Sequence, residues 1–238
     1  MTRRRARHAL GAAVVAVVLA TSLAGCQARP RVIVYGDSLV WESSREITQW
    51  AASRGWDVTI RQRFGGAPCS FFSQMRADRA SRPDEVILSF AGNPSYLEPC
   101  VGADVTASYR AQMREVKRIW TGSGTEVTWA EVPFVPAAES EPAQQAMRVE
   151  SHRQGLKVID AGRYVTPDGV YVWTQPCMAG ERCIGSQLSP SVPPGRNIVR
   201  ANDRTHFCPG PGHGLDPCPV YSSGSWRYAR ALTEALVS

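Results

Sequence analysis

Several short segments of the 238-residue chain carry side chains that together could perform acyl transfer. The segment GDSL at 36–39 offers the hydroxyl of Ser38, and Asp203 stands three residues before His206 near the C-terminus. A serine hydroxyl is a poor nucleophile until a neutral imidazole takes its proton, and a carboxylate can hold that imidazole in the required tautomer. The sequence therefore predicts Ser38 as nucleophile, His206 as general base and Asp203 as the group that orients the base.

An acyl-transfer site also needs hydrogen-bond donors for the oxyanion of the tetrahedral intermediate. The candidates are the backbone N–H of Ser38, the backbone N–H of Gly66 in GGAPC and the side-chain amide of Asn93 in AGNP. Gly65 is an alternative to Gly66, since neither residue has a side chain to shield its N–H. For Asn93 a purely structural role in the turn before Pro94 is the alternative, because asparagine favours turns.

Elements that could position these residues are visible as alternating strand and helix patterns. Apolar segments rich in Val and Ile predict strands over 32–35, 57–64, 85–90, 126–132 and 156–160. Helical patterns cover 43–54, 72–80, 104–120, 141–153 and 222–236. This alternation predicts an α/β fold with three layers, in which a central parallel sheet of about five strands lies between helices.

The candidate residues follow the ends of the predicted strands. In an open parallel sheet ligands bind beyond the carboxyl ends of the strands, so the loops after the first three strands should meet at one edge. Residues 161–221 interrupt the alternation with a long segment rich in Pro, Gly and Cys. Loops of this length are usually functional or disordered, and we expect this one to be ordered, pinned by disulfides and decisive for substrate choice.

These motifs resemble those of the GDSL, or SGNH, hydrolase family, which comprises esterases and lipases of flavodoxin-like α/β fold. The resemblance spans 31–238 and places the family's Ser block at Ser38, its Gly block at Gly66, its Asn block at Asn93 and its D-x-x-H block at Asp203 and His206. One departure is that the family usually has G-x-N-D, whereas Pro94 follows Asn93 here.

The resemblance implies a serine esterase that forms an acyl-enzyme on Ser38 and needs no cofactor. Its partner would be an ester-bearing small molecule, a lipid or an acylated envelope glycan. Two alternatives remain open from the sequence. One is an O-acyltransferase that passes the acyl group to a glycan or glycolipid, and the other is a non-catalytic lipoprotein that binds the envelope.

The N-terminus has the features of a bacterial export signal, with a basic start followed by an apolar run that ends in small residues. The segment LAGC, which ends at Cys26, resembles the lipobox of bacterial lipoproteins, in which the cysteine becomes the lipidated N-terminus. We therefore expect a signal peptide over 1–25, a tether over 26–31 and a catalytic domain over 32–238. The protein would be anchored to the outer face of the cell membrane, with secretion as the alternative.

The net charge of +6 is not a sign of nucleic-acid binding. Four arginines and no acidic residues lie in 1–25, so the mature chain carries a charge of about +2. The other basic residues are almost all arginine, with Lys117 and Lys157 as the only lysines. The sequence therefore predicts no nucleic-acid partner.

Beyond Cys26 six cysteines remain, and an exported chain favours disulfides between them. Six cysteines allow many pairings, and we favour the sequence-local pairs Cys177–Cys183 and Cys208–Cys218, which leave Cys69 with Cys100. A zinc site formed by His206, Cys208, His213 and Cys218 is the alternative. Because their spacing fits no compact Cys/His pattern, the prediction is that no metal is bound.

Overall fold

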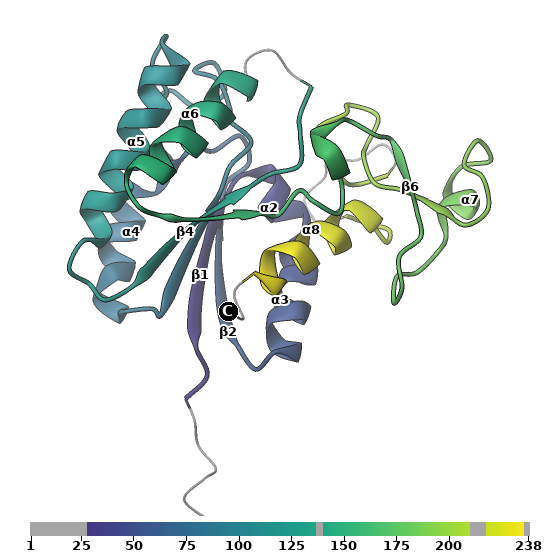
Figure 1. Cartoon of the computed structure of the whole chain (residues 1–238), viewed down its shortest axis with the longest axis horizontal. Coiled ribbons are helices and arrows are strands. Elements are labelled where there is room, and N and C mark those ends of the chain that lie inside the picture. The colour runs from purple at the N-terminus through teal and green to yellow at the C-terminus, as the bar shows by residue number, and fades with distance from the viewer. Residues whose placement is uncertain (1–27, 137–139, 210–217, 236–238) are drawn as a thin grey trace, which may run out of the picture.

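A five-stranded parallel sheet forms the centre of the molecule (Figure 1). The computed structural model describes residues 28–136, 140–209 and 218–235. The strands are β1 (Arg31–Gly36), β2 (Asp57–Gln62), β3 (Glu85–Ser89), β4 (Glu126–Glu131) and β5 (Lys157–Asp160), in the order β2-β1-β3-β4-β5. The order reverses direction at β1, so a crevice is expected where the carboxyl ends of β1 and β3 diverge.

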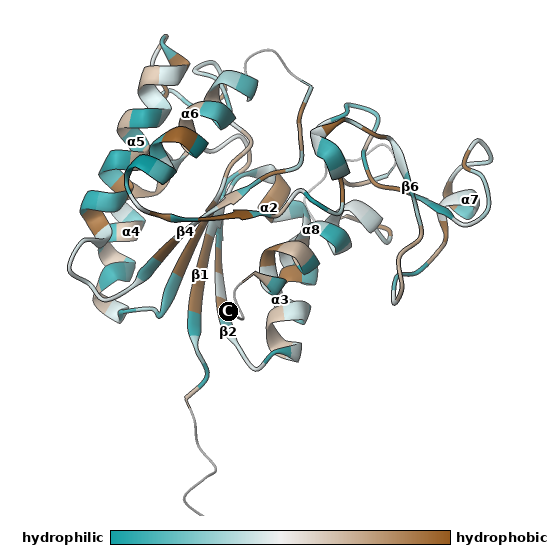
Figure 2. Ribbon diagram, in the orientation of Figure 1, coloured by the Kyte–Doolittle hydropathy of each residue, from teal (hydrophilic) through white to brown (hydrophobic). Residues whose placement is uncertain are grey.

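Helices cover both faces of this sheet, which confirms the predicted three-layer α/β/α architecture. One face carries α3 (Ser44–Ser53) and α8 (Ser223–Glu234), and the other carries α4 (Phe72–Asp78), α5 (Val105–Trp120) and α6 (Ser140–Arg153). Successive residues of β1 point to opposite faces, so that Val32 and Val34 enter one core while Ile33 and Tyr35 enter the other. Figure 2 shows the hydrophobic strands enclosed between helices with hydrophilic outer faces.

The central sheet and its helices follow the sequence pattern closely. In α5 the side chains of Tyr109, Met113, Val116 and Trp120 recur at helical spacing, and all four are buried. The carboxylate of Asp104 caps this helix by accepting the N–H of Ala107 at 2.8 Å.

In the described parts of the chain, none of the helices is both long and apolar enough to span a membrane.

Two regions differ from the prediction. The short helix α2 (Ser38–Glu42) starts directly after β1 and has no separate helical pattern in the sequence. Residues 161–221, predicted as an ordered loop, contain a small antiparallel sheet of β6 (Thr174–Pro176) and β7 (Arg196–Ile198), with α7 (Gly185–Leu188) between them. Short 3-10 turns lie at η1 (Pro68–Phe71), η2 (Arg79–Ser81) and η3 (Pro167–Gly169).

A buried ion pair attaches this small sheet to the main domain. The guanidinium of Arg227 on α8 lies 2.7 Å from the carboxylate of Glu181, and both side chains are almost fully buried. Burial raises the pKa of the Glu181 carboxyl, but hydrogen bonds from Arg227 and Ser223 outweigh it and hold the pKa below its usual value. The small sheet is therefore anchored to α8.

The described cysteines form the three disulfides that the sequence analysis favours, Cys69–Cys100, Cys177–Cys183 and Cys208–Cys218. Cys208 and Cys218 are bonded to each other and lie near the carboxylate of Glu42. Their sulfurs therefore cannot act as thiolate ligands in the alternative zinc site, whose fourth residue, His213, lies outside the described residues.

Removal of the Cys69–Cys100 disulfide should destabilise the domain strongly. The bond closes a loop with a sequence separation of 31, and loop-closure entropy then predicts a loss of about 3–4 kcal/mol when both cysteines are replaced by serine. The Cys177–Cys183 bond closes a separation of only 6, so the same replacement there should cost about 2 kcal/mol. Urea unfolding of both double variants measures the difference, and equal losses would contradict this account.

Candidate active site

Ser38 is held at the junction of β1 and α2, where the strand turns at once into a helix. Asp37 caps α2, its Oδ1 accepting the N–H of Leu39 at 3.1 Å. A Cβ on Gly36 would lie 2.1 Å from Cγ2 of Val40 and 2.7 Å from the carbonyl oxygen of Ser89, so only glycine fits this tight turn. The junction brings Ser38 to the carboxyl edge of the sheet and places its N–H in the first helical turn, where no intrahelical acceptor is available.

Ser38, His206 and Asp203 form a continuous hydrogen-bonded chain. The Nε2 atom of His206 lies 2.9 Å from Oγ of Ser38, and its Nδ1 atom lies 2.5 Å from Oδ2 of Asp203. Oδ1 of Asp203 accepts the backbone N–H groups of Thr205 at 2.9 Å and His206 at 3.0 Å, which fixes the carboxylate in its turn. The structure thus brings together the three residues that the sequence singled out, although 165 positions separate Ser38 from Asp203 in the numbering.

The electrostatic environment favours a strongly polarised imidazole. Burial lowers the pKa of His206, but the hydrogen bond to Asp203 and the negative charges of Glu42, Asp203 and Asp37 outweigh it, so the pKa lies above its usual value. Burial likewise raises the pKa of Asp203, yet its hydrogen bonds with His206 and Thr205 hold the pKa far below the usual range. Asp203 is therefore ionised at any pH where His206 can act as a base.

Asn93 and the glycine loop lie beside Asp37, but their donors are engaged. The Nδ2 group of Asn93 donates to Oδ2 of Asp37 at 3.1 Å and to the carbonyl oxygen of Gly66 at 2.9 Å. The N–H of Gly66 donates to the carbonyl of Arg63 at 3.0 Å, in a turn that needs the positive φ of 69° at Gly65. The predicted oxyanion donors thus reach the same edge of the sheet, with two of them bound to protein acceptors.

The Cys69–Cys100 disulfide joins the glycine loop to the segment that follows Asn93. Two further contacts support this connection. Oγ of Ser70 donates to the Glu98 carboxylate at 2.8 Å and accepts the N–H of Ala67 at 3.0 Å. The two loops are therefore held to each other independently of the sheet.

Asp37 has a structural role at this edge. Its carboxylate is fully buried and accepts the N–H of Ala91 at 2.6 Å as well as the bonds from Leu39 and Asn93. Burial raises the pKa of Asp37 to about 6, although these hydrogen bonds oppose the shift. Asp37 connects the loops that follow β1 and β3.

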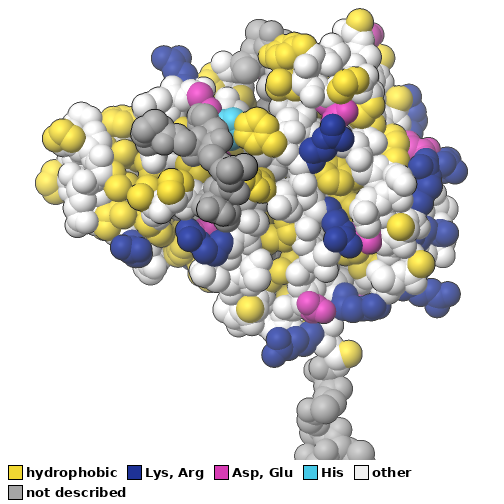
Figure 3. Space-filling model, turned by 180° about the vertical axis from the view of Figure 1, so that it is seen from behind, with side chains coloured by type: hydrophobic (Ala, Val, Ile, Leu, Met, Phe, Trp, Pro, Cys, Tyr) yellow, Lys and Arg dark blue, Asp and Glu magenta, His cyan; other side chains and the backbone are white. Residues whose placement is uncertain are grey.

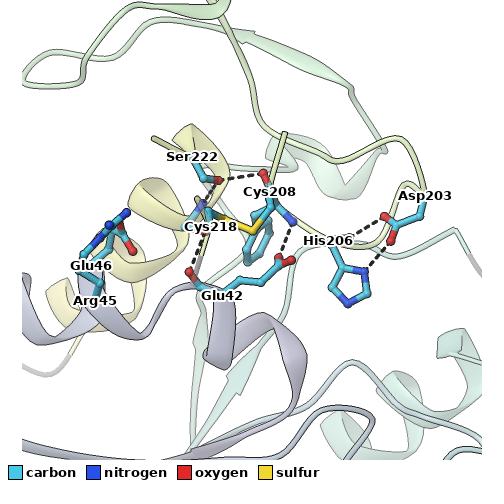
Figure 4. Close-up of a disulfide and its surroundings, with 10 residues drawn as sticks. Glu42, Arg45, Glu46, Asp203, His206, Cys208, Cys218 and Ser222 are labelled. Carbon is cyan, nitrogen blue, oxygen red and sulfur yellow. Dashed lines mark hydrogen bonds and ion pairs between the residues drawn. A yellow bond between two sulfur atoms is a disulfide. The ribbon is translucent and has the colours of Figure 1, made fainter. Parts of the chain in front are cut away.

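Two charged residues that hold the backbone on either side of His206 were missed by the sequence analysis. Glu42 is 1% exposed and its Oε2 accepts the N–H of Phe207 at 2.7 Å, so that it lies between the His206 segment and the Cys208–Cys218 disulfide (Figure 4). Arg200 is fully buried and donates to the carbonyl oxygens of Thr205 at 2.5 Å and Phe134 at 2.7 Å. The only sequence signal for these two residues is a charged side chain within an apolar segment. Such a signal does not indicate which groups the charge contacts.

An exposed aromatic ring covers one side of His206. The ring of Phe64 stacks on the imidazole with centroids 5.8 Å apart and an interplanar angle of 8°, and Trp41 meets Phe64 edge-on. Phe64 remains 58% exposed, whereas Phe71 is part of the core. Of the aromatic residues that flank the candidate loops, Phe64 and Trp41 therefore form an aromatic surface beside His206.

Comparison with models of known protein families finds no match, and comparison with curated proteins finds none either. Comparison with solved structures does find chains that share the α/β architecture. The C-terminal catalytic domain of peptidoglycan O-acetyltransferase A from Streptococcus pneumoniae is similar with a TM-score of 0.51 and 12% identity, over 88% of this chain and 94% of that domain.

Two further structures are somewhat less similar. A GDSL-like lipase from Bacteroides thetaiotaomicron has a TM-score of 0.49 and 12% identity, over 91% of this chain and 94% of the lipase. The periplasmic domain of a lipopolysaccharide acetyltransferase from Salmonella ser. Paratyphi A has a TM-score of 0.49 and 8% identity, over 90% and 85% of the two chains. At 12% identity the likeness to the Streptococcus pneumoniae domain shows the fold alone.

Proposed function

We propose that the chain is a serine esterase of the cell envelope that cleaves O-acyl esters through an acyl-enzyme on Ser38. The observation that carries the proposal is the hydrogen-bonded chain from Ser38 through His206 to Asp203. With its proton on Nδ1, His206 presents the lone pair of Nε2 to the serine hydroxyl. This is the arrangement that general-base activation of a serine requires.

In the proposed reaction Ser38 Oγ attacks the ester carbonyl while its proton passes to Nε2 of His206. Asp203 stabilises the resulting imidazolium, which then protonates the departing alcohol, and water attacks the acyl-enzyme with His206 again as base. The Ser38 N–H is one donor to the oxyanion. The Asn93 amide would be a second once it exchanges its bond to the Gly66 carbonyl, and an N–H of Gly66 or Gly65 would be a third.

The proposed location is the outer face of the cell membrane, with Cys26 as the lipidated residue. The signal sequence and Cys26 lie outside the described residues, so this part of the proposal rests on the sequence. Three disulfides support it, because such bonds persist in oxidising compartments outside the cytoplasm.

Labelling with a fluorophosphonate tests whether the site is catalytic. The probe reacts with activated serines, so mass spectrometry should find one adduct on Ser38, and Ser38→Ala should abolish it. Ser44→Ala, which alters an ordinary serine at the start of α3, is the matched control and should label normally. An unlabelled chain would instead support the non-catalytic envelope-binding alternative.

O-acyl transfer to a glycan or glycolipid is the second candidate function. It is favoured by the likeness to the peptidoglycan O-acetyltransferase domain, which is at the level of the fold. Both reactions share the acyl-enzyme and differ in whether water or a sugar hydroxyl accepts the acyl group. Mass spectrometry of products formed from an activated ester with an envelope glycan present distinguishes them, since only a transferase yields acylated glycan.

The pH profile of ester hydrolysis should report the titration of His206. Because the raised pKa of His206 keeps more of the imidazole protonated, activity should rise with pH and reach half its maximum above the ordinary histidine value. In Glu42→Gln a negative charge near His206 is lost, so this half-maximum should move to lower pH. Measured kcat/KM against pH tests the shift.

Glu126→Gln is the matched control for this profile. It removes the same charge at the start of β4, at the opposite edge of the sheet, and its profile should coincide with that of the parent. Coincident profiles for parent and Glu42→Gln would show that Glu42 acts only as an acceptor for the N–H of Phe207.

A further inference from the structure

The end of the sheet opposite the candidate active site carries an open cavity of about 610 Å³ lined by arginines. Its lining consists of Arg76, Arg79, Ala80, Arg82, Gly122, Ser123 and Gly124, and we call it the basic cavity. A neighbouring cavity of about 320 Å³ shares Gly122 and Gly124 with it and is lined in part by Lys117 and Lys157. The only two lysines of the chain thus lie beside three exposed arginines.

Much of the positive charge here is not neutralised. Arg76 forms an ion pair with Glu115 at 2.5 Å, and Lys157 lies 4.0 Å from Glu126. By contrast, Arg79 donates to the neutral carbonyl of Thr121 at 2.8 Å. Within the described residues neither Arg79 nor Arg82 has a carboxylate partner.

The backbone does not account for an arginine at position 82. Arg82 adopts the left-handed conformation with a φ of 47°, which glycine and asparagine occupy at lower cost. Its side chain is exposed and lines the basic cavity. An arginine at this position is therefore better explained by a bound ligand than by the conformation of the turn.

The described chain enters the domain directly beside this cavity. The Arg31 guanidinium donates to the carbonyl of Arg82 at 2.7 Å, and the Arg31 N–H donates to Asp84 at 2.7 Å. Figure 3 shows Lys and Arg side chains around the point where the described chain begins. Only five residue steps separate Cys26 from Arg31, so a lipid on Cys26 would keep this end within about 18 Å of the membrane.

We propose that the basic cavity binds the phosphate headgroups of an anionic phospholipid surface. A lipid surface is the favoured source of phosphate because this is the end of the domain from which the tether leaves. Since β1 runs from this end to Ser38, its six residues place the active site about 20 Å away at the opposite edge. The domain would therefore stand on the membrane with its active site directed away from it, toward the envelope.

The distance of about 18 Å to the membrane assumes the lipid anchor of the proposed function. The binding of phosphate headgroups can be tested without that anchor. The chain from residue 27 onward, which contains every described element and lacks Cys26, is sedimented with vesicles of phosphatidylcholine made with and without phosphatidylglycerol. We expect binding to the anionic vesicles only, with weaker binding as salt concentration rises. The double variant Arg79→Glu/Arg82→Glu should bind them about 20-fold more weakly or worse, since each basic residue at such a surface contributes about fivefold.

The matched control is Arg148→Glu/Arg182→Glu, which makes the same change in net charge at exposed arginines away from the basic cavity. It should bind as the parent does, and an equal loss in both double variants would overturn the proposal. Equal binding to neutral vesicles would also overturn it, as would binding of inorganic phosphate without any binding to anionic vesicles.

Circular dichroism and fluorophosphonate labelling separate this test from that of the proposed function. The variant Arg79→Glu/Arg82→Glu should remain folded and should still be labelled on Ser38, because its substitutions lie at the far end of the sheet. If the parent binds anionic vesicles and is not labelled, the esterase proposal fails and the membrane proposal stands. If the parent is labelled and does not bind, the membrane proposal fails alone.

Discussion

Replacement of Ser38 by alanine is expected to lower kcat/KM for a short-chain aryl ester by about 10⁴- to 10⁶-fold. Alanine removes the attacking oxygen that lies 2.9 Å from Nε2 of His206 and leaves the backbone N–H at the start of α2. What remains is then the modest acceleration that oxyanion donors and binding provide without a nucleophile. Initial rates of aryl acetate hydrolysis measure the loss.

Ser44→Ala controls for the removal of a hydroxyl near the site. Ser44 is the first residue of α3, and its alanine variant should retain the rate of the parent. Turnover by Ser38→Ala within tenfold of the parent would contradict the acyl-enzyme mechanism. Circular dichroism of the same Ser38→Ala sample records whether the sheet and helices persist. A loss of activity caused by unfolding would therefore be recognised.

Replacement of Asp203 by asparagine is expected to lower kcat by about 10⁴-fold while the fold stays intact. Oδ1 of an asparagine can still accept the N–H groups of Thr205 and His206, so the loop conformation should persist. An amide in place of Oδ2, however, donates to Nδ1 and so favours the imidazole tautomer with its proton on Nε2. That tautomer cannot take the proton of Ser38.

The pH profile distinguishes this role from a merely structural one. Without the Asp203 carboxylate the pKa of His206 loses its largest upward contribution, so residual activity should reach half its maximum at lower pH than in the parent. Asp168→Asn is the matched control, since Asp168 is exposed and its φ of 65° is tolerated by asparagine. A parent-like kcat in Asp203→Asn would remove Asp203 from the mechanism.

The charged residues around His206 hold the base in position. Asp203 contacts the imidazole directly, Glu42 anchors the following residue, and Arg200 holds the carbonyl of Thr205 just before it. Burial lowers the pKa of Arg200 to about 10, yet its guanidinium also lies over the Phe207 ring at 5.2 Å. The base is therefore positioned from both sides along the chain.

The central sheet could be predicted from the sequence more fully than the loops and short elements around it. Buried parallel strands need apolar side chains on both faces, so the segments VIVY and VILS indicate such strands. The apolar residues of α5 recur at helical spacing and so predict a helix with one buried face. The helix α2 could not be predicted in this way, because five residues are too few for a periodic pattern and its start depends on the Asp37 cap. The small sheet of β6 and β7 was missed for a similar reason, since three-residue strands have no alternation to detect.

The helix start near Ser43 shows how tertiary contacts override a local pattern. Ser43 with Glu46 three residues later is typical of a capping box. In the structure Ser43 does precede α3, but its hydroxyl makes no capping bond, and the Glu46 carboxylate instead accepts from Arg45 at 3.1 Å. Because α2 runs directly into α3, the N–H of Ser43 already donates to the carbonyl of Leu39, so the Glu46 carboxylate is not needed as its acceptor.

The α/β architecture, the residues with acyl-transfer chemistry and the favoured cysteine pairs could be predicted from the sequence, because they depend on residue type, periodicity and short separations along the chain. Which groups contact one another depends instead on the folding of the whole chain. It joined Ser38 to His206, engaged Asn93 and Gly66 with protein acceptors, and placed the Glu42 carboxylate against the N–H of Phe207. Apart from the turn that joins Gly66 to Arg63, these contacts are between residues far apart in the chain, so no local pattern records them.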